Sequence, residues 1–291
     1  MKKQFLYRLS LGVSLLAGAA YLACLALNVD PATGFLRAGS PLPWYVVFAL
    51  CAVLALCAGW AVPLRAPAGG KAAGPAPLWA AMGAASVLQG AAVAVRAIAG
   101  TDLPDAAHNT PLFTVLIQGG GVLCGLLYLL WGAFCALAAV RLRTGRALPG
   151  SLLGLGIAGS AAVYVYVILR FIVKPASWQR LLITADTLGA LCVLLLCAAL
   201  LRALFLPQSP AAARNLARMG LLAFAFGTCL ALPQGIWQLA AGNAGWDALA
   251  AGIFCGAAGL QGAVCAGRAF RVQPVQGTQS GASADAPENT P

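Results

Sequence analysis

Long apolar runs recur along the whole length of this chain, and they constrain its fold more than any other feature. A bilayer core of ~30 Å needs about 20 apolar residues as helix, because each residue rises ~1.5 Å. Runs of this length lie at approximately 6–28, 43–63, 78–99, 112–140, 150–173, 181–205, 217–241 and 246–268. The sequence therefore predicts an all-α fold, a polytopic integral membrane helix bundle of about eight transmembrane helices.

The bundle is expected to occupy residues 1–271, because the composition changes at that point. The stretch that begins at Arg271, RVQPVQGTQSGASADAPENTP, is polar and rich in Gly, Pro and Ser. Such segments bury too little apolar surface to offset the entropy lost on ordering. We predict that residues 272–291 form a disordered cytoplasmic tail.

The charge of the chain also points to a membrane. Of its 291 residues, 61% are hydrophobic and 9% are charged, against about 25% charged residues in a soluble domain. A net charge of +11 is compatible with nucleic-acid binding, but such proteins gather their basic residues on one exposed face. Here the basic residues fall between apolar runs. The predicted partner is therefore the lipid bilayer, with no role for nucleic acid.

The basic residues predict the orientation of the spans. Thirteen of the eighteen fall on one side of the predicted membrane, and these are Lys2, Lys3, Arg8, Arg65, Lys71, Arg141, Arg143, Arg146, Arg202, Arg214, Arg218, Arg268 and Arg271. Loops rich in Lys and Arg stay in the cytoplasm. We therefore predict a multi-pass protein of the plasma membrane whose N- and C-termini are both cytoplasmic, which requires an even number of spans.

The first span resembles a signal peptide, because basic residues precede an apolar run that ends at YLAC, residues 21–24. Tyr21 is a poor residue three positions before a cleavage-site cysteine, and the run is longer than a usual signal core. We expect the span to be retained, although cleavage at Cys24 would leave seven spans with the same cytoplasmic C-terminus.

The outer loops are centred near residues 35, 105, 177 and 244, so they recur about every 70 residues. This period predicts four helical hairpins of parallel orientation, an arrangement that transporters use. Regularly spaced spans give the same period without any duplication, so both explanations remain open.

Small residues and one proline predict how the helices pack. Two pairs of glycines, Gly121 with Gly125 and Gly252 with Gly256, lie four residues apart on one helix face and allow close approach of another backbone. Pro233 lacks an N–H group and is expected to kink the seventh span near Cys229.

The sequence holds no convincing catalytic or metal-binding motif. Its ten cysteines all lie in apolar runs without a CxxC pair, which is typical of small buried hydrophobic residues. The single histidine, His108, has Asp102 and Asp105 nearby but too few other donors for a metal site. We predict no metal, no cofactor and no catalytic residue.

Ionisable and amide side chains at membrane depth are the candidate functional residues. Arg170 lies about four residues before the outer end of the fifth span and Asp186 about seven residues into the sixth, so the two should lie at comparable depth and stabilise one another. Arg96 is expected to join them from the third span, and Gln118 to lie nearby on the fourth. With two arginines and one aspartate, this site would carry a net positive charge.

Two classes of function follow from these residues. In the first, Arg96, Gln118, Arg170 and Asp186 line an outward-facing polar pocket for a small anionic or zwitterionic solute, and the protein transports or binds that solute. In the second, the ion pair only locks helices together in a non-catalytic accessory subunit of a membrane complex. Its partner, another membrane protein or a second copy of the chain, would dock on the glycine faces. An enzyme is the third candidate.

Overall fold

The computed structural model describes residues 2–30, 33–63, 73–100, 110–173, 179–207, 209, 211–242 and 245–271. Within these ranges, eight helical segments are long and apolar enough to cross a membrane, which confirms the predicted all-α polytopic bundle. The predicted tail at 272–291 and the loop residue His108 lie outside the described residues.

The spans follow the predicted apolar runs closely, except that the seventh begins at Ala212 and not near residue 217. In chain order the helices are α1 (Lys2–Asn28), α2 (Leu42–Trp60), α3 (Ala76–Ala99), α4 (Pro111–Arg143), α5 (Leu152–Val173), α6 (Leu181–Phe205), α7 (Ala212–Ala223), the π-helical segment η2 (Phe224–Ala231), α8 (Leu232–Ala240) and α9 (Trp246–Arg271).

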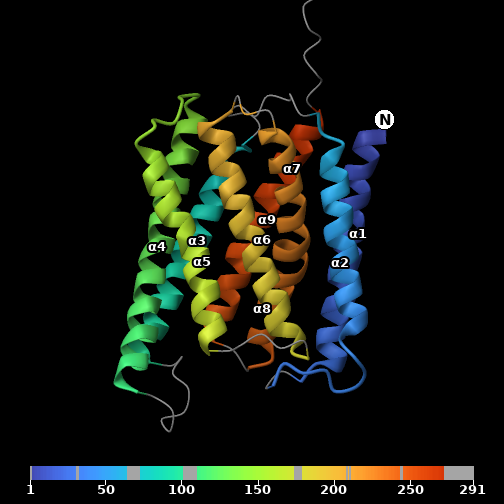
Figure 1. The fold of residues 1–291 in the computed structure, drawn as a ribbon, viewed down its shortest axis with the longest axis vertical. Coiled ribbons are helices and arrows are strands. Elements are labelled where there is room, and N and C mark those ends of the chain that lie inside the picture. Colours follow the sequence, from blue (N-terminus) through green and yellow to red (C-terminus); the bar gives the residue numbers. More distant parts are fainter. Residues whose placement is uncertain are drawn as a thin grey trace, which may run out of the picture.

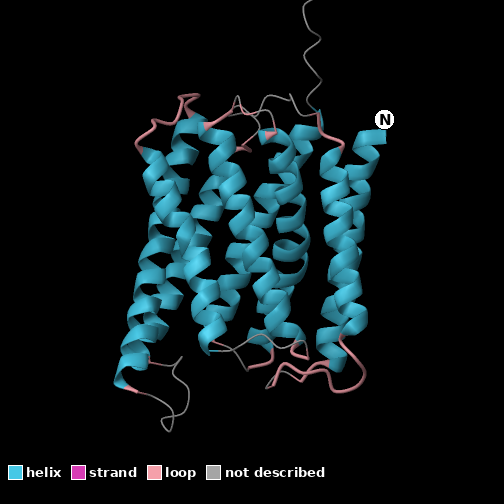
Figure 2. Ribbon diagram, in the orientation of Figure 1, coloured by secondary structure: helices cyan, strands magenta, loops and turns pink. Residues whose placement is uncertain are grey.

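The helices form four antiparallel hairpins that all enter from the same end of the bundle (Figure 1). The described chain begins and ends at that end, which we call the terminal end; we call the opposite end the pocket end. The described loops lie at these two ends (Figure 2). An even number of spans explains why the two ends of the described chain lie at one face of the bundle.

Helices α6, α7, η2 and α9 form the centre of the bundle (Figure 1). Helix α9 packs against α3, α7, η2 and α8, while the α1–α2 hairpin covers one side and α3, α4 and α5 cover the other. Helix α9 also contacts α1 and α6, so helices from all four hairpins meet around it. This arrangement brings α3 and α9, which are distant in sequence, into contact near the pocket end.

Local sequence explains where the helices near the pocket end stop and start. Helix α3 ends at Gly100, whose φ of 67° is the left-handed conformation that glycine adopts without strain. Helix α4 begins after Thr110, whose side chain accepts a hydrogen bond from the backbone N–H of Phe113 at 3.3 Å. Pro111 follows at the first helical position, where its missing N–H costs nothing.

The predicted irregularity in the seventh span is present, in the form of a π-helical segment that precedes Pro233. A proline ring collides with the carbonyl four residues earlier, here that of Cys229. The wider turn of a π-helix relieves this collision over Phe224–Ala231. Thr228 donates a hydrogen bond to the carbonyl of Gly256 on α9 at 2.9 Å, so the irregular segment is tied to the central helix.

The glycine pairs serve contacts inside the chain. Gly121 and Gly125 face Ala97, Ala94 and Gly90 of α3, and a Cβ atom at either position would collide with that helix. Gly252 lies against the carbonyl of Ala231 and the backbone of Gly235, and Gly256 lies against the side chain of Leu232 in α8. The expectation that these faces receive a partner protein was therefore wrong, because neighbouring helices of the same chain already cover them.

Buried amides at the pocket end also have structural roles. Tyr21 of α1 donates a hydrogen bond to Oε1 of Gln234 in α8 at 2.6 Å. The Nε2 atom of Gln234 donates to the carbonyl of Leu182 in α6 at 3.0 Å. Since Tyr21 and Gln234 are fully buried, this chain of bonds fastens α1 to the centre of the bundle.

Candidate functional site

A small cavity lies at the pocket end, between α3, α4, α5 and α9. Its volume is about 90 Å³. The residues that line it are Val93, Arg96, Ile117, Gly121, Tyr166, Leu169, Arg170, Val173 and Asp247. Apolar side chains and three charged groups therefore surround one site, which we call the polar pocket.

The first ion pair at this site joins Arg170 of α5 to Asp186 of α6, as the sequence predicted. The two helices form a hairpin, so the end of one lies at the depth where the other begins. Arg170 also donates a hydrogen bond from Nη1 to the hydroxyl of Tyr166, one helical turn earlier, at 2.8 Å. Arg170 lines the polar pocket. Asp186 is not a lining residue, but it forms the ion pair with Arg170.

The second ion pair joins Arg96 of α3 to Asp247 of α9. Asp247 lies in the first turn of α9, where the partial positive charge of the helix N-terminus also stabilises its negative charge. Arg96 was expected beside Arg170, and it does line the same pocket, but its ion pair is with Asp247, which was not among the predicted site residues. The helices of the first pair are consecutive along the chain, whereas α3 and α9 belong to different hairpins, so local chain order does not predict the second pair.

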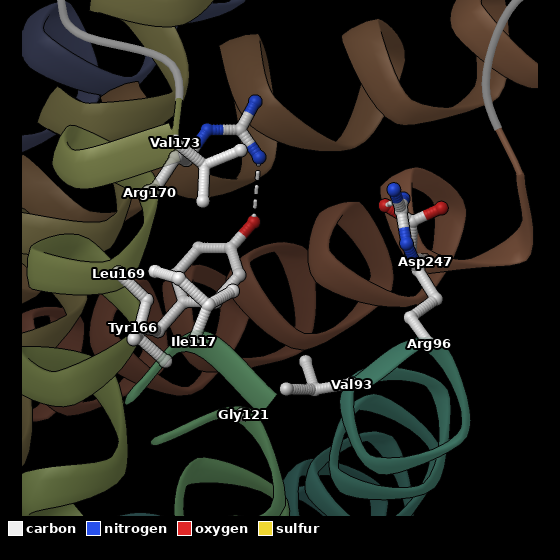
Figure 3. A pocket seen from close by; sticks show the side chains of 9 residues that line it. All are labelled: Val93, Arg96, Ile117, Gly121, Tyr166, Leu169, Arg170, Val173 and Asp247. Carbon is white, nitrogen blue, oxygen red and sulfur yellow. Dashed lines mark hydrogen bonds and ion pairs between the residues drawn. The ribbon is translucent and has the colours of Figure 1, made fainter. Parts of the chain in front are cut away.

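Arg170 of the first ion pair faces the Arg96–Asp247 pair across the polar pocket (Figure 3). Arg170 and Tyr166 lie on one side, with their hydrogen bond drawn as a dashed line, and Arg96 and Asp247 lie on the other. The side chains in the two pairs are 15–28% exposed, so they are neither fully buried nor fully solvated.

The formal charge of the site differs from the expectation. Two arginines and two aspartates cancel among the described residues, so the predicted net positive charge was wrong. The reason is Asp247, whose carboxylate balances Arg96. The site instead presents separate positive and negative groups with no net charge.

The buried polar atoms of this constellation that lack a hydrogen-bond partner within the described chain include Oδ1 of Asp247, an acceptor, and Nε of Arg170, a donor. Such atoms are rare in folded proteins and are costly, because each loses its hydration without a replacement. The site therefore retains unused hydrogen-bonding capacity of both signs.

Gln118, the fourth predicted residue, lies beside this pocket on α4 and not among the residues that line it. The lining positions of that helix are Ile117 and Gly121, one turn apart on the same face. A helix turns by about 100° per residue, so the neighbour of a lining residue points elsewhere. Gln118 is partly exposed.

The described residues contain no group of three His, Cys, Asp or Glu side chains that could hold a metal ion. Nine of the ten cysteines are buried and free, and only Cys57 is exposed. Buried thiols spread over many helices are suited to packing.

No protein-family model matches the chain, and neither a curated protein nor a solved structure matches it. Function is therefore inferred from the geometry and charges of the chain itself.

Proposed function

We propose that this membrane protein binds a small zwitterionic solute in the polar pocket and carries it across the bilayer. The observation that supports this proposal is the pair of opposed ion pairs, Arg170–Asp186 and Arg96–Asp247, around one cavity. Ionisable residues at membrane depth are costly to insert, and they mark solute pathways in many transporters.

The balance of charge favours a zwitterion over an anion. A solute with one positive and one negative group can complement a carboxylate and a guanidinium at once, and it leaves the site neutral. The unused acceptor on Asp247 and the unused donor on Arg170 offer one hydrogen bond to each end of such a solute.

The basic residues support an outward orientation of the pocket in the plasma membrane. Most of the arginines of the described chain lie at the terminal end, among them Arg141, Arg143, Arg214 and Arg268. The positive-inside rule assigns that end to the cytoplasm. The polar pocket then opens toward the outside, where a solute enters without first crossing the membrane.

An accessory subunit of a membrane complex is the second candidate. One observation favours it: all four charged side chains are already paired within the chain. Paired intramembrane charges can serve only to hold helices together. This function requires a stoichiometric partner protein but no water-filled pocket, so the two candidates make opposite predictions about solvent access.

Cysteine labelling separates the two functions. We would replace Cys57, the exposed native cysteine, by alanine and introduce Ile117→Cys, which faces the cavity, or Leu116→Cys as its matched control. Leu116 is 56% exposed on the outer surface of the bundle, at nearly the same depth but toward lipid.

We expect a membrane-impermeant thiol reagent added to intact cells to modify Ile117→Cys and not Leu116→Cys, and a bound zwitterion to protect the thiol. Equal lack of reaction at both positions, with a partner protein that copurifies, would refute the pocket and favour the accessory function.

A further inference from the structure

A second hollow lies on the side of the bundle, in the seam between α3 and α9. It has a volume of about 630 Å³ and an almost entirely apolar lining. The side chains that matter here are Leu88, Ala91 and Val95 from α3, and Trp246, Leu249 and Ile253 from α9. We call this hollow the lateral groove.

The lateral groove opens toward the surface that lipid covers. Val95 is 65% exposed and Trp246 is 73% exposed, although both are large apolar residues. A contiguous surface of exposed apolar side chains is expected against hydrocarbon or against an apolar ligand. The exposed indole of Trp246, at the first position of α9, also marks the depth of the lipid headgroups.

The groove and the polar pocket share two residues. Arg96 and Asp247 line both hollows, so their ion pair separates a charged site from an apolar one. A small solute would use only the pocket. A molecule with a charged head and an alkyl chain would use both, with its head beside Arg96, Asp247 and Arg170 and its chain between α3 and α9.

We propose that the zwitterion is the headgroup of a membrane lipid, a phospholipid with an ethanolamine head, and that one of its acyl chains lies in the lateral groove. This inference rests on the proposed function and deepens it, because it names the class of solute. The groove runs from Arg96 to Leu88 on α3, or ~12 Å at helical rise, and so holds the first part of a chain.

Charge complementarity specifies the headgroup. A phosphate accepts paired hydrogen bonds from guanidinium groups, which Arg96 and Arg170 supply at the pocket. A primary ammonium carries N–H donors, and Oδ1 of Asp247 is a buried acceptor that has no partner within the described chain. A choline group lacks N–H donors and cannot satisfy this oxygen. A glycerol headgroup carries no ammonium group, so the lipid is net negative and its charge repels the carboxylate of Asp247.

Native mass spectrometry of the purified full-length protein tests this inference. The probes are ethanolamine, choline and glycerol phospholipids with identical chains, together with water-soluble glycerophosphoethanolamine. We would compare Ala91→Phe, which fills the groove without touching a charged residue, with Ala84→Phe, an exposed position two turns deeper on α3 that does not line the groove.

We expect the ethanolamine phospholipid to bind at least about tenfold more tightly than the choline phospholipid, because one charge-assisted hydrogen bond is worth about that factor. Ala91→Phe should abolish the tighter binding of the ethanolamine phospholipid relative to glycerophosphoethanolamine, and Ala84→Phe should preserve it.

Other outcomes overturn the inference. If glycerophosphoethanolamine binds as tightly as the lipid and Ala91→Phe has no effect, the lipid assignment fails while the proposed function stands. If the glycerol or choline phospholipid binds best, the headgroup assignment fails. If no zwitterionic probe binds at all, both the inference and the proposed function fail.

Discussion

Arg96 and Asp247 form an ion pair between α3 and α9, two helices that belong to different hairpins. The pair lies at the one place where the polar pocket and the lateral groove meet. Its first consequence concerns stability, because breaking the pair from either side leaves a partly buried charge without its counterion.

Arg96→Ala and Asp247→Ala should each lower the melting temperature of the protein in detergent, and the double variant should recover part of the loss. The coupling free energy is expected near 0.6 kcal/mol and no more than about 1.7 kcal/mol, the range of polar contacts between membrane helices. A double-mutant cycle measures it. Strictly additive losses would mean that the two side chains do not stabilise each other.

Asp186→Ala should destabilise the protein more than Arg170→Ala. The first substitution strands a guanidinium that is 22% exposed, and the second leaves an aspartate that can take up a proton. Melting temperatures of the two variants, with the double variant as reference, check this order. The reverse order would show that a stranded Asp186 carboxylate costs more than a stranded Arg170 guanidinium, so that protonation does not relieve the loss of its partner.

Tyr166→Phe should cost about 1 kcal/mol in the free energy of unfolding, because it removes the hydrogen bond that Arg170 donates to the tyrosine hydroxyl. Tyr164→Phe is the matched control, two residues earlier on α5 and 56% exposed. Equal effects of the two substitutions on denaturant or thermal unfolding would argue against a role for the bond.

Gly227→Ala should destabilise the protein by about 1–3 kcal/mol, the usual cost of overpacking a filled interior. The added Cβ atom would collide with the backbone of Cys255, where η2 approaches α9. Gly154→Ala in α5 meets open space, so it should be neutral or slightly stabilising. A Gly227→Ala variant as stable as the parent would show that the contact between η2 and α9 can relax.

The orientation of the spans is testable with reporter fusions. Fusions after residues 105, 145, 177, 210, 244 and 291 should alternate between outside and inside, with the first one outside and the last one inside. An external reporter after residue 291 would reverse the proposed direction of the pocket. Labelling of the N-terminus in intact cells tests separately whether the first span is cleaved at Cys24.

The sequence was sufficient to predict the spans and one of the two ion pairs. Span length follows from hydrocarbon thickness, and the pairing of Arg170 with Asp186 follows from a short turn between neighbouring helices. Both inferences need only local chain order.

Asp247 was missed because its partner lies in another hairpin. Nothing in the local sequence shows that α3 packs against α9, since that contact depends on how whole hairpins assemble around the centre. Gln118 was misjudged for a smaller reason. A shift of one position along a helix decides whether a side chain faces a cavity. In a membrane protein both the lipid-facing and the core-facing sides are apolar, so the periodicity of apolar residues does not show which side faces inward.

The most direct test of the pocket uses its charge. With Ile117→Cys in the Cys57→Ala protein, rates of modification by a negatively and a positively charged impermeant thiol reagent would be compared, each relative to a free thiol. A neutral pocket that opens outward predicts similar relative rates for both reagents. Asp247→Asn should then favour the negative reagent by about threefold to tenfold, because one negative charge is lost at close range. A thiol that reacts with neither reagent, or a ratio that Asp247→Asn leaves unchanged, would contradict the account.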